Sequence, residues 1–136
     1  MNFQWSKEYE TGVAKFDEQH KALFTLVLKL QTAMEKNEGS SATRGILEEL
    51  IGYTKSHFKD EEAALEASGF SGLAAHREEH VKLTNQVGRY YSDLITGKIV
   101  FSGAILNFLL NWLTEHIAKC DKEYGPHFSK HPVRPS

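Results

Sequence analysis

Histidines carry the most distinctive chemistry of this sequence. Seven of them lie among 136 residues, and two pairs, His57/Glu61 and His76/His80, are spaced i, i+4, which places both members on one helix face. A single histidine on an apolar helix face is more often a core residue than a ligand. Five of them with an acidic residue predict a metal centre instead, because a buried carboxylate needs polar partners. The candidate metal ligands are His20, His57, Glu61, His76, His80, His116 and Asp121.

This donor set, imidazoles and carboxylates without a thiolate, limits the choice of metal. Structural zinc takes four ligands, often including cysteine, whereas calcium and magnesium take oxygen ligands. Seven nitrogen and oxygen ligands are too many for one ion and suit two transition metals that accept imidazole. If both ions are octahedral and share the two carboxylates and an oxide or hydroxide, one coordination position stays open. Such a vacancy is what reversible binding of a small diatomic molecule requires.

His116 and Asp121 are spaced i, i+5, which fits an α-helix poorly. The two positions differ by about 140° around an ideal helix. The spacing therefore predicts a π-type bulge or a fraying helix end near Asp121. The alternative is that Asp121 is a solvated surface residue.

Four stretches with helical periodicity must position these side chains, and turn signals separate them. The stretches lie at roughly 17–37, 42–67, 72–96 and 103–121. Their short connections predict an all-α, antiparallel up-down-up-down four-helix bundle with an N-terminal extended segment, and residues 1–136 are expected to form one domain. Gly125 and Pro126 are expected to end the helical part, which would leave His127 and His131 in a solvated tail.

The candidate ligands converge in this topology. In an up-down-up-down bundle, the starts of the first and third helices and the ends of the second and fourth lie at the same end. At about 1.5 Å of rise per residue, all seven ligands fall within about two or three turns of that end.

Composition narrows the expected function. Charged residues make up 25% of the chain and the net charge is −2, so no basic surface favours nucleic acid. The first residues lack the apolar core of a signal peptide, and the longest apolar run, around 108–113, is too short to span a bilayer. Cys120 is the sole cysteine, which excludes an internal disulfide. We therefore expect a cytoplasmic monomer that binds neither nucleic acid nor a membrane.

The ligand types also bear on the choice between binding and catalysis. Ferritin-like di-iron proteins use four carboxylates and Glu-x-x-His motifs on two helices, and this sequence has no such pair of motifs. A site of mostly neutral ligands favours oxygen activation less than a site with four carboxylates does. We therefore expect binding without enzymatic activity.

The ligands lie within five characteristic stretches of sequence, which Trp5 precedes: 16–24, 57–62, 76–80, 112–117 and 121–125. In this order they resemble the hemerythrins, especially the single-domain bacteriohemerythrins, over almost the whole chain. The resemblance implies two iron ions with an oxide or hydroxide bridge. It also implies reversible dioxygen binding by a carrier for oxygen transport, storage or delivery.

The same resemblance implies a role for each ligand. The ligands of a coordinatively saturated iron would be His76, His80 and His116. The iron with the vacancy would be held by His20 and His57, and both irons would share Glu61 and Asp121.

An apolar oxygen pocket is expected beside the irons, since a dry site keeps protons and water from bound oxygen. The candidates lie within one turn of ligands and are Leu23, Leu83, Trp112, Leu113 and Ile117. Their alternative role is ordinary core packing. Tyr124 is expected either to form a hydrogen bond near the site or to lie exposed in the tail.

Other functions stay open on the sequence alone. A module that senses oxygen, nitric oxide or iron could use the same site. A di-iron enzyme that handles nitric oxide or peroxide and a purely structural bundle are further alternatives. For a carrier, the expected recipient of the oxygen is an oxygen-consuming enzyme.

Overall fold

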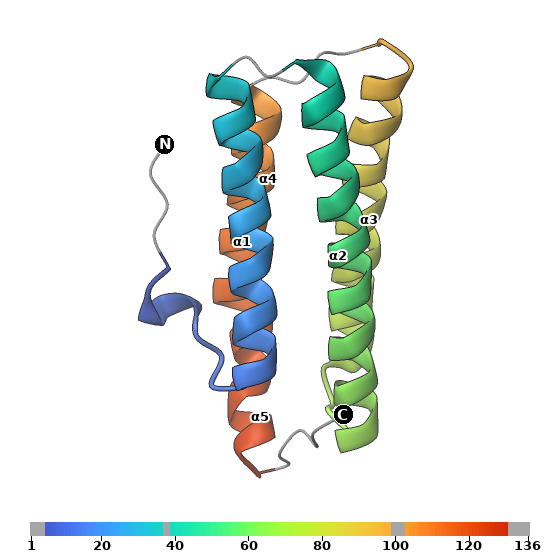
Figure 1. The fold of residues 1–136 in the computed structure, drawn as a ribbon. Coiled ribbons are helices and arrows are strands. Elements are labelled where there is room, and N and C mark those ends of the chain that lie inside the picture. Colours follow the sequence, from blue (N-terminus) through green and yellow to red (C-terminus); the bar gives the residue numbers. More distant parts are fainter. Residues whose placement is uncertain (1–4, 37–38, 99–102, 131–136) are drawn as a thin grey trace.

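The computed structural model describes residues 5–36, 39–98 and 103–130, most of which are helical. The four long helices are α1 (Ala14–Glu35), α2 (Ser40–Ser68), α3 (Leu73–Ile95) and α4 (Gly103–Glu115) (Figure 1). Successive helices run in opposite directions along a common axis (Figure 1). The predicted antiparallel four-helix bundle is therefore confirmed.

Each helix turns one apolar face toward the bundle interior. On α1 the buried positions Phe16, His20, Leu23, Val27 and Leu30 recur every three or four residues, which keeps them on one side of the helix. Apolar residues of all four helices join in one core cluster. The candidate ligand on α1 thus occupies a core position and continues the face that packs the bundle.

The turn between α2 and α3 holds two ligand-bearing helix ends together. Gly69 adopts a left-handed conformation with φ of 73°. Its N–H donates to the carbonyl of Glu66 at 3.2 Å, and the N–H of Phe70 donates to the carbonyl of Leu65 at 3.0 Å. This is the Schellman pattern, which ends a helix sharply. The last third of α2 therefore faces the first turns of α3.

The N-terminal segment lies along the outside of α1 and contains a short 3₁₀ turn, η1 (Lys7–Tyr9) (Figure 1). The rings of Trp5 and Tyr9 pack against Phe24, with centroid distances of 5.8 and 5.6 Å. The backbone N–H and the hydroxyl of Thr11 both donate to Asp17 Oδ1 at 2.8 Å. These bonds tie the segment to the first turn of α1, which begins at Ala14 rather than at 17.

The chain changes helix type after α4. A π-helical turn, η2 (His116–Cys120), is followed by a 3₁₀ turn, η3 (Asp121–Tyr124). A π turn contains more residues than an α turn, so it reduces the angular offset between backbone positions 116 and 121. The predicted π-type distortion near Asp121 is confirmed.

The expectation that Gly125 and Pro126 end the helical part is wrong. A short helix, α5 (Gly125–Lys130), begins there. Pro126 lies in its first turn, where a missing N–H leaves no intrahelical bond unmade. His127 is half-buried rather than solvated, with Nε2 2.8 Å from Ser68 Oγ and its ring against Phe70. His131 lies outside the described residues.

None of the described helices is both long enough and apolar enough to cross a bilayer.

The close approach of Gly125 to the N-terminal segment gives a first test. A Cβ atom at this position would overlap the carbonyl oxygen of Thr11, so Gly125→Ala must displace backbone. We expect the free energy of unfolding to fall by about 1–3 kcal/mol, as for other overpacked sites. Urea unfolding measures this loss.

Gly52→Ala is the matched control, because no atom lies within 4 Å of a Cβ built at this exposed position of α2. It should stabilise the protein by about 0.5–1 kcal/mol, since alanine favours a helix. Equal effects of the two substitutions would contradict the packing of α5 against the N-terminal segment.

Candidate metal centre

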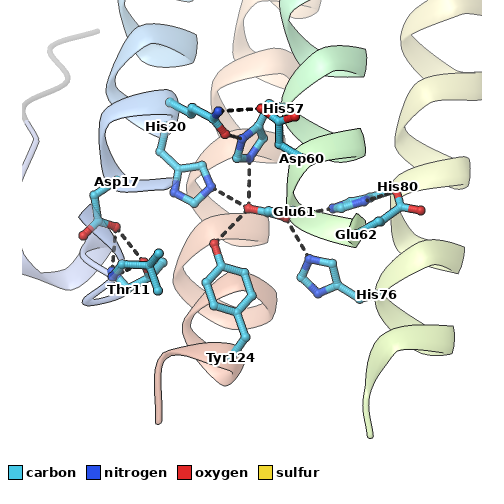
Figure 2. A network of polar contacts seen from close by, with 12 residues as sticks. Thr11, Asp17, His20, His57, Asp60, Glu61, Glu62, His76, His80 and Tyr124 are labelled. Atoms are coloured by element: carbon cyan, nitrogen blue, oxygen red, sulfur yellow. Dashed lines mark hydrogen bonds and ion pairs between the residues drawn. The ribbon is translucent and has the colours of Figure 1, made fainter. Parts of the chain in front are cut away.

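Glu61 lies at the centre of the candidate site, with no exposed surface. Its Oε2 atom is 3.0 Å from His20 Nε2 and 2.9 Å from His57 Nε2. Its Oε1 atom is 3.0 Å from His76 Nε2 and 3.3 Å from His80 Nε2. One carboxylate therefore faces imidazoles from three helices (Figure 2).

The donor atoms form two groups that meet at this carboxylate. The first group contains Glu61, His76, His80 and His116, and the second contains His20, His57 and Glu61. Within each group the possible ligand atoms lie within 4.8 Å of one another, and every residue is buried. Each group is compact enough to surround one metal ion. The donors are nitrogen and oxygen atoms, which suits a transition metal that accepts imidazole.

Topology explains why residues so distant in sequence meet. His20 lies early in α1, His57 and Glu61 lie late in α2, and His76 and His80 occupy the first turns of α3. His116 begins the π turn that follows α4. The first turns of α1 and α3, the last third of α2 and the segment after α4 lie toward the lower end of the bundle in Figure 1. The convergence of six of the seven candidate residues agrees with the expectation from the antiparallel topology.

Asp121, the seventh candidate, is placed by its backbone alone. It begins η3, immediately after the π turn that carries His116. Its side chain is not among those the structure describes, so its part in the site stays a prediction.

The surroundings of Glu61 favour its ionised form. Burial raises the pKa of this carboxyl group. The charge interaction with His57 and hydrogen bonds from His20, His57 and His76 outweigh that effect and hold the pKa well below its ordinary value. Glu61 is therefore an anionic donor surrounded by imidazoles.

Tyr124 completes the contacts of Glu61. Its ring is fully buried, and its hydroxyl donates to Glu61 Oε2 at 2.8 Å. The ring packs against Phe16 and Phe128, at centroid distances of 5.7 and 5.4 Å. Of the two expected places for Tyr124, the structure supports the one at the site. The turn η3 and helix α5 make the difference, because they bury Tyr124 and Phe128 in one apolar cluster with Phe16.

Apolar side chains from several helices are buried in the core around the two donor groups. All five residues expected to line an oxygen pocket are buried in the core cluster: Leu23, Leu83, Trp112, Leu113 and Ile117. Phe58 belongs to the same cluster and stacks on the ring of His80, with centroids 3.7 Å apart and planes 5° from parallel. These residues surround the ligands with apolar surface, and their role in holding oxygen stays a prediction.

Three further polar residues lie outside the ligands, where Gln19 and Glu62 contact histidines directly and Asp60 contacts Gln19. Gln19 Oε1 is 2.5 Å from His57 Nδ1, and Gln19 Nε2 donates to Asp60 at 2.9 Å. Glu62 Oε2 is 2.8 Å from His80 Nδ1. Their neighbours in sequence, His20 and Glu61, were the only available signal for them.

Comparison with known proteins agrees with this geometry. The sequence profile described as the Hemerythrin HHE cation binding domain matches residues 11–128. The chain belongs to the hemerythrin family. It is 36% identical over 120 residues to a bacteriohemerythrin of Methylococcus capsulatus, covering 88% of this chain and 90% of that protein. A bacteriohemerythrin of Pseudomonas aeruginosa is 31% identical, over 88% of this chain and 77% of its own length.

Solved structures show the same fold. The crystal structure of a wild-type hemerythrin superposes with a TM-score of 0.86 at 34% sequence identity, covering 93% of this chain and 97% of the other. Membership of the family together with the buried histidine and glutamate cluster fits a non-haem di-iron site. Hemerythrins are not enzymes, in agreement with the expectation from the donor set.

The hydroxyl of Tyr124 can be tested by Tyr124→Phe. A hydrogen bond to a buried carboxylate is lost without a change of shape, so we expect the free energy of unfolding of the metal-free protein to fall by about 1.5–3 kcal/mol. Chemical denaturation monitored by circular dichroism measures the change.

Tyr91→Phe serves as the control for this variant. The Tyr91 hydroxyl donates to Glu48 at the bundle surface, where water can replace the bond. Its loss should change stability by no more than about 0.5 kcal/mol. If Tyr124→Phe were as stable as Tyr91→Phe, the hydrogen bond from the Tyr124 hydroxyl to Glu61 would not stabilise the protein.

Proposed function

We propose that this protein binds dioxygen reversibly at a pair of non-haem iron ions. The observation that carries the proposal is the division of Glu61 between two imidazole groups. Oε1 faces His76 and His80, whereas Oε2 faces His20 and His57. A carboxylate that offers one oxygen to each of two donor groups is suited to bridge two ions.

The two groups differ in their number of imidazoles, and this difference supports a vacancy on one side. We assign His76, His80 and His116 to one iron and His20 and His57 to the other. Glu61 is the first shared carboxylate. Asp121 is proposed as the second, and the π turn before it supports this role by bringing backbone position 121 closer in phase to His116. The bridging oxide or hydroxide implied by the family completes the proposed set.

The iron pair supplies the chemistry that holds oxygen, and the chain supplies position and dryness. Phe58 stacks on the imidazole of His80 and packs edge-on against Trp112, and Phe16 packs edge-on against the imidazole of His57. Leu23, Leu113 and Ile117 are buried in the core beside them. An apolar enclosure of this kind slows the entry of protons and water, and it favours release of oxygen unchanged.

Iron loading tests the proposed function directly. The metal-free protein is supplied with Fe(II) without oxygen, and metal content is measured after desalting. We expect two irons per chain and a visible absorption band that appears with oxygen and disappears on degassing, over repeated cycles. A content of one iron per chain, or none, would contradict the di-iron assignment. Irreversible oxidation in the first cycle would leave the iron pair and remove the reversible function.

His57→Ala tests the assignment of the two-histidine group. Removing this imidazole takes away one ligand and one partner of buried Glu61, so we expect fewer than two irons per chain. Stability of the loaded protein should fall by about 3 kcal/mol, the lower end for breaking a buried ion pair, because Glu61 keeps other donors.

His127→Ala is the control for that variant. His127 is a half-buried histidine of α5 that contacts Ser68 and Phe70 and belongs to neither donor group. It should retain two irons per chain. Full iron content in His57→Ala would contradict the ligand assignment.

A further inference from the structure

The outer nitrogen of His57 is held by a relay of two polar side chains. Gln19 Nε2 donates to Asp60 Oδ2 at 2.9 Å, and a carboxylate can only accept. The amide nitrogen of Gln19 must therefore face Asp60, which turns its oxygen, Oε1, toward His57 Nδ1 at 2.5 Å. An amide oxygen also only accepts, so Nδ1 carries the hydrogen. When a metal is bound, the lone pair of His57 is then on Nε2, the nitrogen that faces Glu61 (Figure 2).

His80 reaches the same tautomer through a charged partner. Its Nδ1 lies 2.8 Å from Glu62 Oε2, which again only accepts. Its Nε2 is 3.3 Å from Glu61 Oε1, on the interior side. Glu62 is itself held by Arg77, whose Nε donates to Glu62 Oε1 at 3.3 Å while its Nη2 donates to Glu66 at 2.8 Å. The lone pair of His80 thus also points into the cluster.

The two relays differ in charge next to the imidazole. His57 meets a neutral amide, with the carboxylate of Asp60 one residue further away. His80 meets a carboxylate directly, and Arg77 offsets part of its charge from a half-exposed position. A carboxylate behind a ligating histidine makes the imidazole more basic and a stronger donor than an amide does. A stronger donor favours the more highly charged state of a metal ion.

We propose that Gln19 and Glu62 are positioning residues that fix the metal-binding tautomers of His57 and His80, and that Glu62 makes the three-histidine position the more easily oxidised of the two. This inference rests on the iron pair of the proposed function, but it does not depend on oxygen binding. Asp60 acts on His57 indirectly, because it sets the orientation of the Gln19 amide.

Glu62→Gln tests the charged relay, and Glu66→Gln is its matched control. Both substitutions remove one negative charge from neighbouring turns of α2, and both residues contact Arg77, but Glu66 has no contact with His80. We expect about tenfold weaker iron binding for Glu62→Gln, measured by competition with a chelator, and little change for Glu66→Gln. Anaerobic titration with redox mediators should give a more positive potential of the iron pair for Glu62→Gln.

A charge-neutral exchange tests the amide relay. Gln19→Glu combined with Asp60→Asn moves the carboxylate next to His57 while an asparagine amide still donates to it, so the net charge is unchanged. This double variant should show a more negative potential than the unmodified protein. Asp60→Asn alone is the control, since it frees the Gln19 amide to turn. In the metal-free protein, nitrogen NMR should show a hydrogen on His57 Nδ1, and this hydrogen should be partly lost in Asp60→Asn.

The outcomes separate this inference from the proposed function. Equal iron affinity and potential in Glu62→Gln and Glu66→Gln, with two irons bound, would overturn the role of Glu62 and leave the iron pair standing. Unchanged tautomers in Asp60→Asn would overturn the relay through Gln19. Failure of the unmodified protein to bind two irons would remove the proposed function and this inference with it.

Discussion

A carboxylate with no exposed surface is costly to bury, and Glu61 therefore constrains how the helices around it are positioned relative to one another. The cost of taking a charge from water is recovered only when several donors surround it. Here the donors come from α1, α2, α3 and η3. The position of each of these elements along the bundle axis must therefore bring its donor to the Glu61 carboxylate. The apolar core would tolerate small slips of one helix along another. Glu61 does not, because a slip of one residue would carry its partners out of reach.

Much of this arrangement is predictable from the sequence because it depends on periodicity. His20, His57 and His80 occupy positions where a helix turns its apolar face inward, and an antiparallel order of helices brings these positions to one end. The i, i+5 spacing of His116 and Asp121 also carries information, since no regular α-helix satisfies it. The π turn found there is the local structure that the spacing requires.

The features that the sequence did not reveal depend on contacts between helices. Gln19, Asp60 and Glu62 are ordinary polar residues beside the predicted ligands, and only the packing angle of α1 and α3 on α2 brings them to imidazole nitrogens. Helix α5 was missed for another reason. Glycine followed by proline usually ends a helix, but the same pair also suits the first turn of a new one. Tyr124 reaches Glu61 because the chain continues in this way.

Tyr124 and His116 follow the other described residues of the site in sequence, and this order has a consequence for biosynthesis. A ribosome releases the segments of α1, α2 and α3 first, with Glu61 and four of the imidazoles that contact or surround it. In that incomplete chain the carboxylate lacks the Tyr124 hydroxyl and the cover of α4, so water can still reach it. The contact between the Thr11 backbone and Gly125 likewise forms only after Gly125 has been synthesised. Closure of the site thus follows the synthesis of α1, α2 and α3, because the residues that complete it emerge after them.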